Sequence, residues 1–379
     1  MPDHIDEIIA NLHDQAIQAT GLTRFGSDDY LPAMRVLIAS MMSNYPSLNG
    51  ETPQVLGLAL MPLILRLKTE ESFRNHPEYR DVQVDDPVVI VGMPRTGTTA
   101  LHGFLSVDPQ YQVLERWLQS NPQPRPPRET WDSIPEYQQV SVEVEMTPDF
   151  IKRTHYVLAN EGDECLAPMA QTFVSNMFGS QINIPEYDAW FLKQDMTPSF
   201  RRYADFLRLI GLTSPNKVWL LKNPSHVFCL DELFAVFPNA KVIQTHRDPQ
   251  VAIGSVVSLL TAVGEMLGQK RAAADMARRE IDLWAEGMRR SKAARNGRES
   301  SFYDVDYREF VSDPLAVTAD IYNKFGIQLT QEATTAMRSW IDAHPQNLHG
   351  KHSYNPEDLG VTRALVNENF GSYLKEYNL

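Results

Sequence analysis

Short apolar runs, each next to a turn signal, recur along the middle of the chain. Residues 88–91 are all β-branched, and similar runs occupy 218–221, 240–245 and 301–305. Such runs are typical of strands that are buried on both faces of a parallel sheet. Helical patterns, at 225–237 and 266–295, separate or follow them. The alternation predicts an α/β fold with a mostly parallel sheet and right-handed crossovers.

Apolar residues with helical spacing also precede the first strand, for example Ile5, Ile8 and Leu12. We therefore expect a helical N-terminal region over residues 1–84 that packs on the core, and a main domain over 85–379. A proline-dense segment, 121–128, follows the first strand–helix unit and predicts an extended loop near the carboxyl end of the sheet.

Charge and cysteine content narrow the function. The net charge of −13 argues against a nucleic acid or an anionic membrane as partner, because both attract positive surfaces. Cys165 and Cys229 are too few for a disulfide framework or a zinc site, which fits a reducing compartment. Residues 1–10 lack Lys and Arg, and the longest apolar stretch, 55–65, is too short to span a bilayer. We expect a cytoplasmic protein without a transmembrane segment.

The segment from Gly92 to Thr99 lies where the first strand should turn into a helix. Gly92 and Gly97 allow the backbone to approach an anion closely, and the N–H groups of 95–99, with the start of the new helix, favour negative charge there. Arg95 supplies a planar cation that suits phosphate or sulfate. Three hydroxyl groups add donors, those of Thr96, Thr98 and Thr99.

This loop differs from the loop that binds nucleoside triphosphates. The spacing of two glycines with four residues between them is kept, but Thr98 stands where a lysine should follow the second glycine. No strand ends in an aspartate with the context of a Mg²⁺ site. We expect an anionic ligand other than a nucleoside triphosphate, and no metal.

A second cationic position closes a later strand. Arg247 follows the run at 240–245, a turn comes at Asp248-Pro249, and Ser255 lies about two helical turns onward. Ligands of open α/β sheets bind just outside the carboxyl ends of the strands. Arg247 and the loop at Gly92 should therefore converge on one crevice.

Together these segments resemble the sulfotransferases that use 3′-phosphoadenosine 5′-phosphosulfate (PAPS), specifically the bacterial branch with a Gly-x-Pro-Arg-[Ser/Thr]-Gly-Thr-Thr loop. Leu-Leu-Lys-Asn-Pro-Ser-His at 220–226 and Val-Asp-Tyr-Arg-Glu-Phe-Val-Ser-Asp-Pro at 305–314 are similar to two further segments of that family. The resemblance extends from about residue 85 onwards. It implies a P-loop-like, three-layer fold with a central parallel sheet and a helical N-terminal extension.

The resemblance also implies roles. The first loop would hold the 5′-phosphosulfate, and Arg247 with Ser255 the 3′-phosphate. Arg95 and Lys222 would stabilise charge on the leaving phosphate and the sulfuryl group, and Tyr307 would contact the adenine. The chain departs from the cytosolic members by having Arg95 instead of lysine and by lacking a C-terminal Arg-Lys-Gly clamp. Lys351 is the nearest substitute for that clamp.

Two residues are candidates for the base that takes the proton from the acceptor hydroxyl. Glu115 stands twenty residues after Arg95, about where some relatives place a catalytic glutamate, and it is favoured over His226, which follows the second strand. Each has a structural alternative, as an ion-pair partner or as a solvent-facing residue. The acidic cluster at 161–164 is interpreted as a solvated helix start.

We thus expect an enzyme that transfers a sulfuryl group from PAPS to a hydroxyl group of a small molecule, lipid or sugar, with an apolar acceptor among the options. A P-loop phosphotransferase, similar to a kinase, and a non-catalytic nucleotide-binding protein are the alternatives. The sequence does not identify the acceptor, and self-association into a homo-oligomer stays open.

Overall fold

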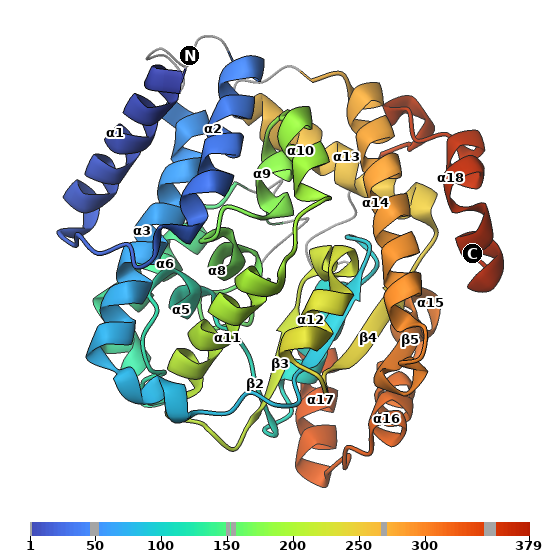
Figure 1. The fold of residues 1–379 in the computed structure, drawn as a ribbon. Helices are drawn as coiled ribbons and strands as arrows, with labels where there is room; N and C mark the ends of the chain where they lie inside the picture. Colours follow the sequence, from blue (N-terminus) through green and yellow to red (C-terminus); the bar gives the residue numbers. More distant parts are fainter. Residues whose placement is uncertain (1, 46–52, 149–151, 153–156, 267–270, 345–353) are drawn as a thin grey trace.

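A five-stranded parallel sheet forms the centre of the computed structural model (Figure 1). The model describes the chain except residues 1, 46–52, 149–151, 153–156, 267–270 and 345–353. The strands are β1 (Val88–Gly92), β2 (Tyr111–Gln112), β3 (Val218–Lys222), β4 (Lys241–His246) and β5 (Phe302–Asp306). Their order across the sheet is β2-β3-β1-β4-β5. The α/β fold with a parallel sheet is confirmed.

Strand β1 lies at the point where the chain changes direction across the sheet. Its residue Ile90 is in register with Lys222 of β3 on one side and Ile243 of β4 on the other. The connection after β1 runs towards β2, and the connection after the neighbouring β4 runs to the opposite side, towards β5. Such a point opens a crevice at the carboxyl ends of the strands. The loop after β1 therefore occupies the position where an α/β sheet binds ligands.

Side chains that alternate along β1 divide the core into two layers of helices around the sheet. Val88 and Ile90 pack with α4 (Thr98–Ser106), α16 (Pro314–Phe325) and α17 (Gln331–Ala343). Val89 and Val91 belong to a larger cluster on the other face, as expected for side chains that alternate between the faces of a strand. The helices of that face are α11 (Thr197–Gly211), α12 (Leu230–Val236), α13 (Pro249–Met266), α14 (Ala273–Arg295) and α18 (Arg363–Glu376).

Several further helices of the described residues are short, apart from α6, and most of them lie between β2 and α11. They include α5 (Arg116–Ser120), α6 (Pro135–Glu145), α8 (Leu166–Ala170), α9 (Asn176–Gln181), α10 (Pro185–Phe191) and α15 (Tyr307–Ser312). Short 3₁₀ turns include η3 (Pro77–Asp81) and η5 (Pro224–Phe228). The helix expected over 225–237 is split at Cys229, and the long helix expected from residue 266 begins at Ala273.

Three N-terminal helices, drawn in blue in Figure 1, pack beside the α/β part. They are α1 (Pro2–Thr20), α2 (Leu31–Asn44) and α3 (Pro53–Asn75). Their apolar residues, such as Met34 and Leu63, belong to the same buried cluster as Val89 of the sheet. The N-terminal helices therefore share one hydrophobic core with the sheet.

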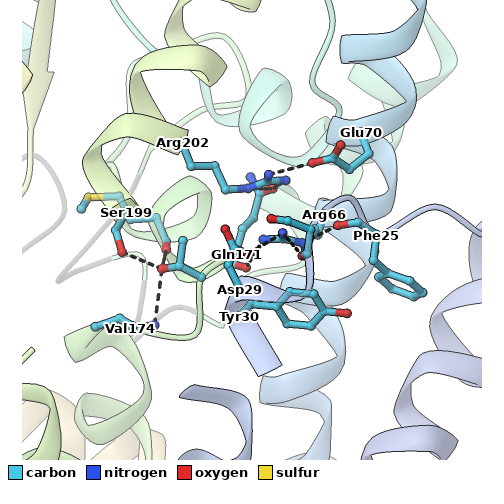
Figure 2. A network of polar contacts seen from close by, with 12 residues as sticks. Phe25, Asp29, Tyr30, Arg66, Glu70, Gln171, Val174, Ser199 and Arg202 are labelled. Atoms are coloured by element: carbon cyan, nitrogen blue, oxygen red, sulfur yellow. Dashed lines mark hydrogen bonds and ion pairs between the residues drawn. The ribbon is translucent and has the colours of Figure 1, made fainter. Parts of the chain in front are cut away.

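A buried arginine joins these helices to the rest of the chain (Figure 2). Arg66 of α3 is fully buried, and its guanidinium donates to the carbonyls of Phe25, Ser27 and Gln171 at 2.6–3.1 Å and to Asp29 at 2.8 Å. Burial lowers the pKa of Arg66. A buried cation is tolerated where its donors are satisfied, so these carbonyls fix the position of α3.

Candidate active site

The loop between β1 and α4 has the backbone geometry of an anion cradle. Gly92, Arg95 and Gly97 all have positive φ, at 141°, 67° and 94°. Glycine is required at 97 for a second reason, because a Cβ there would lie 2.7 Å from the ring of Tyr307. Helix α4 begins directly after this turn, at Thr98, so its positive end faces the same space as the loop.

The three threonines of the loop differ in what their hydroxyl groups do. The Thr96 hydroxyl is buried and bonds to the carbonyl of Met93 and to the hydroxyl of Thr245, at 2.6 and 2.5 Å. It therefore braces the loop, and a contact between Thr96 and the donor stays a prediction. Thr98 and Thr99 line the adjacent cleft.

The structure brings Arg95, Arg247 and Ser255 together. Arg95 Nε donates to Ser255 Oγ at 3.1 Å, and Arg247 Nη1 donates to the backbone carbonyl of Arg95 at 3.0 Å. The Arg247 guanidinium also stacks 4.2 Å from the centre of the Tyr307 ring. Burial lowers the pKa of Arg95, and the nearby Arg247 lowers it further. Two guanidinium groups this close favour an anion between or beside them.

Lys222, at the end of β3, lies on the other side of the loop. Its side chain is fully buried, and Nζ contacts Glu164 Oε1 at 2.9 Å and Thr99 Oγ1 at 3.4 Å. Glu164 is thus an ion-pair partner beside the loop and not part of a solvated helix start, which corrects the sequence-based interpretation. Helix α8 begins only at Leu166. No local pattern marks this pairing, because it joins residues that are 58 positions apart in sequence.

Glu115 makes a different ion pair. Its carboxylate accepts three hydrogen bonds from Arg125, at 3.0–3.2 Å, and both side chains are about nine-tenths buried. Burial raises the pKa of Glu115, although Arg125 opposes that shift. The partner comes from the proline-dense loop, which the sequence analysis did not connect with Glu115. The catalytic role of Glu115 stays a prediction, and these contacts do not favour it.

His226 lies in η5 and is buried, not exposed to solvent. Its ring packs 5.2 Å from that of Phe200, and burial lowers its pKa to about 3. Among the described residues, Nε2 has no hydrogen-bond partner. A histidine in this environment stays neutral and is shielded from a soluble acceptor. Its catalytic role also stays a prediction.

A cleft of about 610 Å³ lies beside the loop after β1. Its lining includes Arg95, Thr98, Thr99, Arg247 and Tyr307, together with further residues of α4. Val157, Leu158, Glu161, Trp340 and His344 also line it, whereas Lys222, Glu164 and Ser255 do not. A larger cleft, of about 930 Å³, lies among the N-terminal helices and contains none of the predicted site residues.

The ring pair of Trp340 and His344 was not predicted from the sequence. Both come from α17 or its C-cap, and their rings stack at a centroid distance of 4.2 Å. Trp340 also packs against Gly103 of α4. The spacing of four residues is that of any helix neighbours, so only the packing of α17 on α4 reveals them. Lys351, predicted near the 3′-phosphate, lies outside the described residues.

The described part of the chain shows neither a metal-binding cluster nor a membrane-spanning helix. No group of three or more His, Cys, Asp or Glu residues there is arranged to hold a metal ion. No helix within it is long and apolar enough to cross a membrane. Both cysteines are buried and unpaired with each other.

A glycine turn at the centre of a parallel sheet, with two arginines and a lysine around it, is an arrangement that suits an anionic ligand. A family model described as "Sulfotransferase family" matches residues 87–331. The chain belongs to this family and is a transferase of sulfuryl groups.

Solved structures agree with that assignment. The sulfotransferase STF1 from Mycobacterium tuberculosis H37Rv is 36% identical, with a TM-score of 0.84 over 96% of this chain and 98% of that one. The sulfotransferase STF9 from Mycobacterium avium is 27% identical, with a TM-score of 0.84 over 97% and 96%. The P-loop-like fold expected from the sequence is confirmed by these structures.

A curated relative has a named acceptor. The omega-hydroxy-beta-dihydromenaquinone-9 sulfotransferase Stf3 of Mycobacterium bovis is 23% identical over 320 residues, which cover 78% of this chain and 76% of the relative. The Stf3 of Mycobacterium tuberculosis matches to the same extent.

Proposed function

We propose that this enzyme takes its sulfuryl group from PAPS and passes it to a hydroxyl group of a small, largely apolar acceptor. The observation that carries the donor assignment is the joining of Arg95, Arg247 and Ser255 beside the glycine turn. PAPS carries anionic groups at both ends of its ribose. A turn that binds one anion and an arginine that binds another at the same crevice match that charge distribution.

The residues present fit such a donor. The backbone N–H groups of Gly97, Thr98 and Thr99, with Arg95, would hold the 5′-phosphosulfate. Arg247 and Ser255 would hold the 3′-phosphate. Tyr307 lines the cleft beside Gly97, where its ring can contact the adenine. Trp340 lines the same cleft and offers a second aromatic surface that the adenine base could contact.

Sulfuryl transfer to a hydroxyl is a displacement in line at sulfur. A bond forms between the acceptor oxygen and sulfur, the bond from sulfur to the phosphate oxygen breaks, and 3′,5′-ADP leaves. Lys222, buried beside Thr99, would balance negative charge on the sulfuryl and leaving oxygens. The hydroxyl proton must go to a base.

We assign that base to Glu164 in preference to Glu115 and His226. Glu164 is the carboxylate that contacts Lys222, and its side chain is 20% exposed, so an acceptor can reach it. Both carboxylates are ion-paired, but Glu115 is only 9% exposed and accepts three hydrogen bonds from Arg125, whereas Glu164 has a single contact with Lys222. His226 is enclosed and has a pKa of about 3, which makes it a poor proton acceptor at neutral pH.

Two observations indicate the class of acceptor: the substrate of the curated relatives and the lining of the cleft. The curated relatives act on a menaquinone derivative, which is an apolar molecule with a hydroxyl group. We propose an acceptor of similar character, because apolar residues such as Val157 and Leu158 line the cleft next to the donor loop. Detecting which sulfated lipids or metabolites disappear when the protein is removed from its source would identify it.

Calorimetric binding of 3′,5′-ADP tests the donor assignment. Arg247→Ala should weaken binding by at least about 30-fold, because one charged partner of a phosphate is removed. Arg289→Ala is the matched control, since its side chain is 69% exposed. Equal affinity in the Arg247 variant and the wild type would refute the clamp.

The same experiment separates the alternatives. A phosphotransferase would bind ATP or GTP with Mg²⁺ more tightly than 3′,5′-ADP, which Thr98 in place of a loop lysine argues against. A non-catalytic binding protein would bind 3′,5′-ADP but would transfer no labelled sulfate from PAPS to a lipid extract.

A further inference from the structure

Helix α18 is drawn in red beside α14 in Figure 1. It contacts His246, the last residue of β4, which Arg247 follows. His246, the residue before Arg247, is buried, and both of its ring nitrogens are bonded. Nδ1 lies 2.9 Å from the hydroxyl of Tyr373, and Nε2 lies 2.9 Å from Asp304. The ring of Tyr377 stacks on His246 at a centroid distance of 3.7 Å.

The Tyr373 hydroxyl can donate its hydrogen to His246 Nδ1, while Nε2–H donates to Asp304. Donors and acceptors are matched along this series, and bonds in such a series strengthen one another. The Tyr373 hydroxyl on α18 thereby holds the side chain of the residue that precedes Arg247.

A second contact from α18 holds the residue after Arg247. Arg363, at the start of the helix, donates to both carboxylate oxygens of Asp248, at 3.1 and 2.6 Å. Asp248 in turn accepts from the backbone N–H of Gln250, at the start of α13. Residues 246 and 248 are therefore each bonded to α18, one on each side of the arginine.

We propose that α18 positions the Arg247 guanidinium for recognition of a 3′-phosphate, with Tyr373 and Arg363 as positioning residues. The inference rests on the proposed function, in which Arg247 contacts that phosphate. The side chain is steered by Tyr307 and the Arg95 carbonyl, but those contacts hold only its tip. The direction in which the side chain leaves the backbone is set by Tyr373 and Arg363.

The test compares 3′,5′-ADP with 5′-AMP, which lacks the 3′-phosphate, by calorimetry. Tyr373→Phe and Arg363→Gln should each bind 3′,5′-ADP about tenfold more weakly and 5′-AMP as well as the wild type does. Lys375→Ala, at an exposed position of the same helix, is the control and should change neither affinity. Arg363 is 43% exposed, so its variant remains informative should Tyr373→Phe fail to fold.

Coupling to Arg247 completes the test. In an Arg247→Ala background, Tyr373→Phe should cause no further loss of 3′,5′-ADP affinity, because the group that it positions is gone. Additive losses, or equal losses for both nucleotides, would overturn the positioning role. A wild-type protein that binds both nucleotides equally would instead contradict the proposed function. Wild-type discrimination that both variants retain would reject the inference alone.

Discussion

The Arg247 guanidinium donates a hydrogen bond to the backbone carbonyl of Arg95, although the two residues are 152 positions apart in sequence. This bond connects the end of β4 with the loop after β1. Both segments leave the same end of neighbouring parallel strands, so the sheet register sets their distance. Any change that shifts β4 against β1 should therefore impair anion binding before it unfolds the protein.

Gly97→Ala should weaken 3′,5′-ADP binding by at least about tenfold. The turn holds residue 97 at a φ of 94°, a conformation that costs residues other than glycine about 1–3 kcal/mol. The new Cβ would also push Tyr307 out of its place. Isothermal calorimetry measures the loss. Gly57→Ala, in open space on α3, is the control and should keep full affinity. Normal binding by the Gly97 variant would show that the loop can rearrange freely.

Glu164→Gln should reduce kcat by about a hundredfold or more, the contribution of a general base, with little change in 3′,5′-ADP affinity. Glu115→Gln, normalised to folded protein, should keep most of kcat. Steady-state assays with labelled PAPS at neutral pH compare kcat of the two variants with that of the wild type. The opposite ranking would restore Glu115 as the base.

Arg125→Ala should destabilise the protein by about 3–5 kcal/mol, because it leaves the Glu115 carboxylate buried without its partner. Urea denaturation gives the free energy of unfolding. Adding Glu115→Gln should recover part of the loss, since the uncompensated charge is removed. Arg289→Ala should change stability by less than about 1 kcal/mol, as exposed ion pairs do. If Arg125→Ala lowered the free energy of unfolding by as little as Arg289→Ala does, water would have to reach the Glu115 carboxylate.

Acid should destabilise the fold through His226. The pKa of this group is 6.5 in the unfolded chain and about 3 in the folded protein. Protons therefore bind the unfolded state first, and the free energy of unfolding should fall as the pH drops below about 6.5, by up to about 1.4 kcal/mol per pH unit. His226→Gln should show a shallower slope between pH 6.5 and 4.5 in denaturation series. His76→Gln, with a 39% exposed side chain, should leave the slope unchanged.

The sequence predicts the strands that are long enough to carry a pattern. Four β-branched or apolar runs correspond to β1, β3, β4 and β5. Strand β2 has only two residues, Tyr111 and Gln112, and two residues show no periodicity. The order of strands across the sheet also cannot be read from local patterns, because pairing is set by crossovers.

The residues of the candidate site also fall into those that local sequence predicts and those that it does not. Arg95 and Arg247 could be predicted because each stands at the end of an apolar run, where a core position is excluded. Glu164 could not, because its importance depends on a lysine that comes 58 positions later. Arg125 was hidden in a proline-rich segment, which indicates a loop but not what the loop contacts.

The central position of β1 also affects how the protein is made. Both strands that flank it, β3 and β4, leave the ribosome long after it does. During synthesis β1 is therefore exposed before either of its neighbouring strands is available to pair with it. An apolar strand with two unpaired edges is prone to associate with other chains. Expression at low temperature, or together with a chaperone that shields nascent segments, should therefore raise the soluble yield more than any change at the surface.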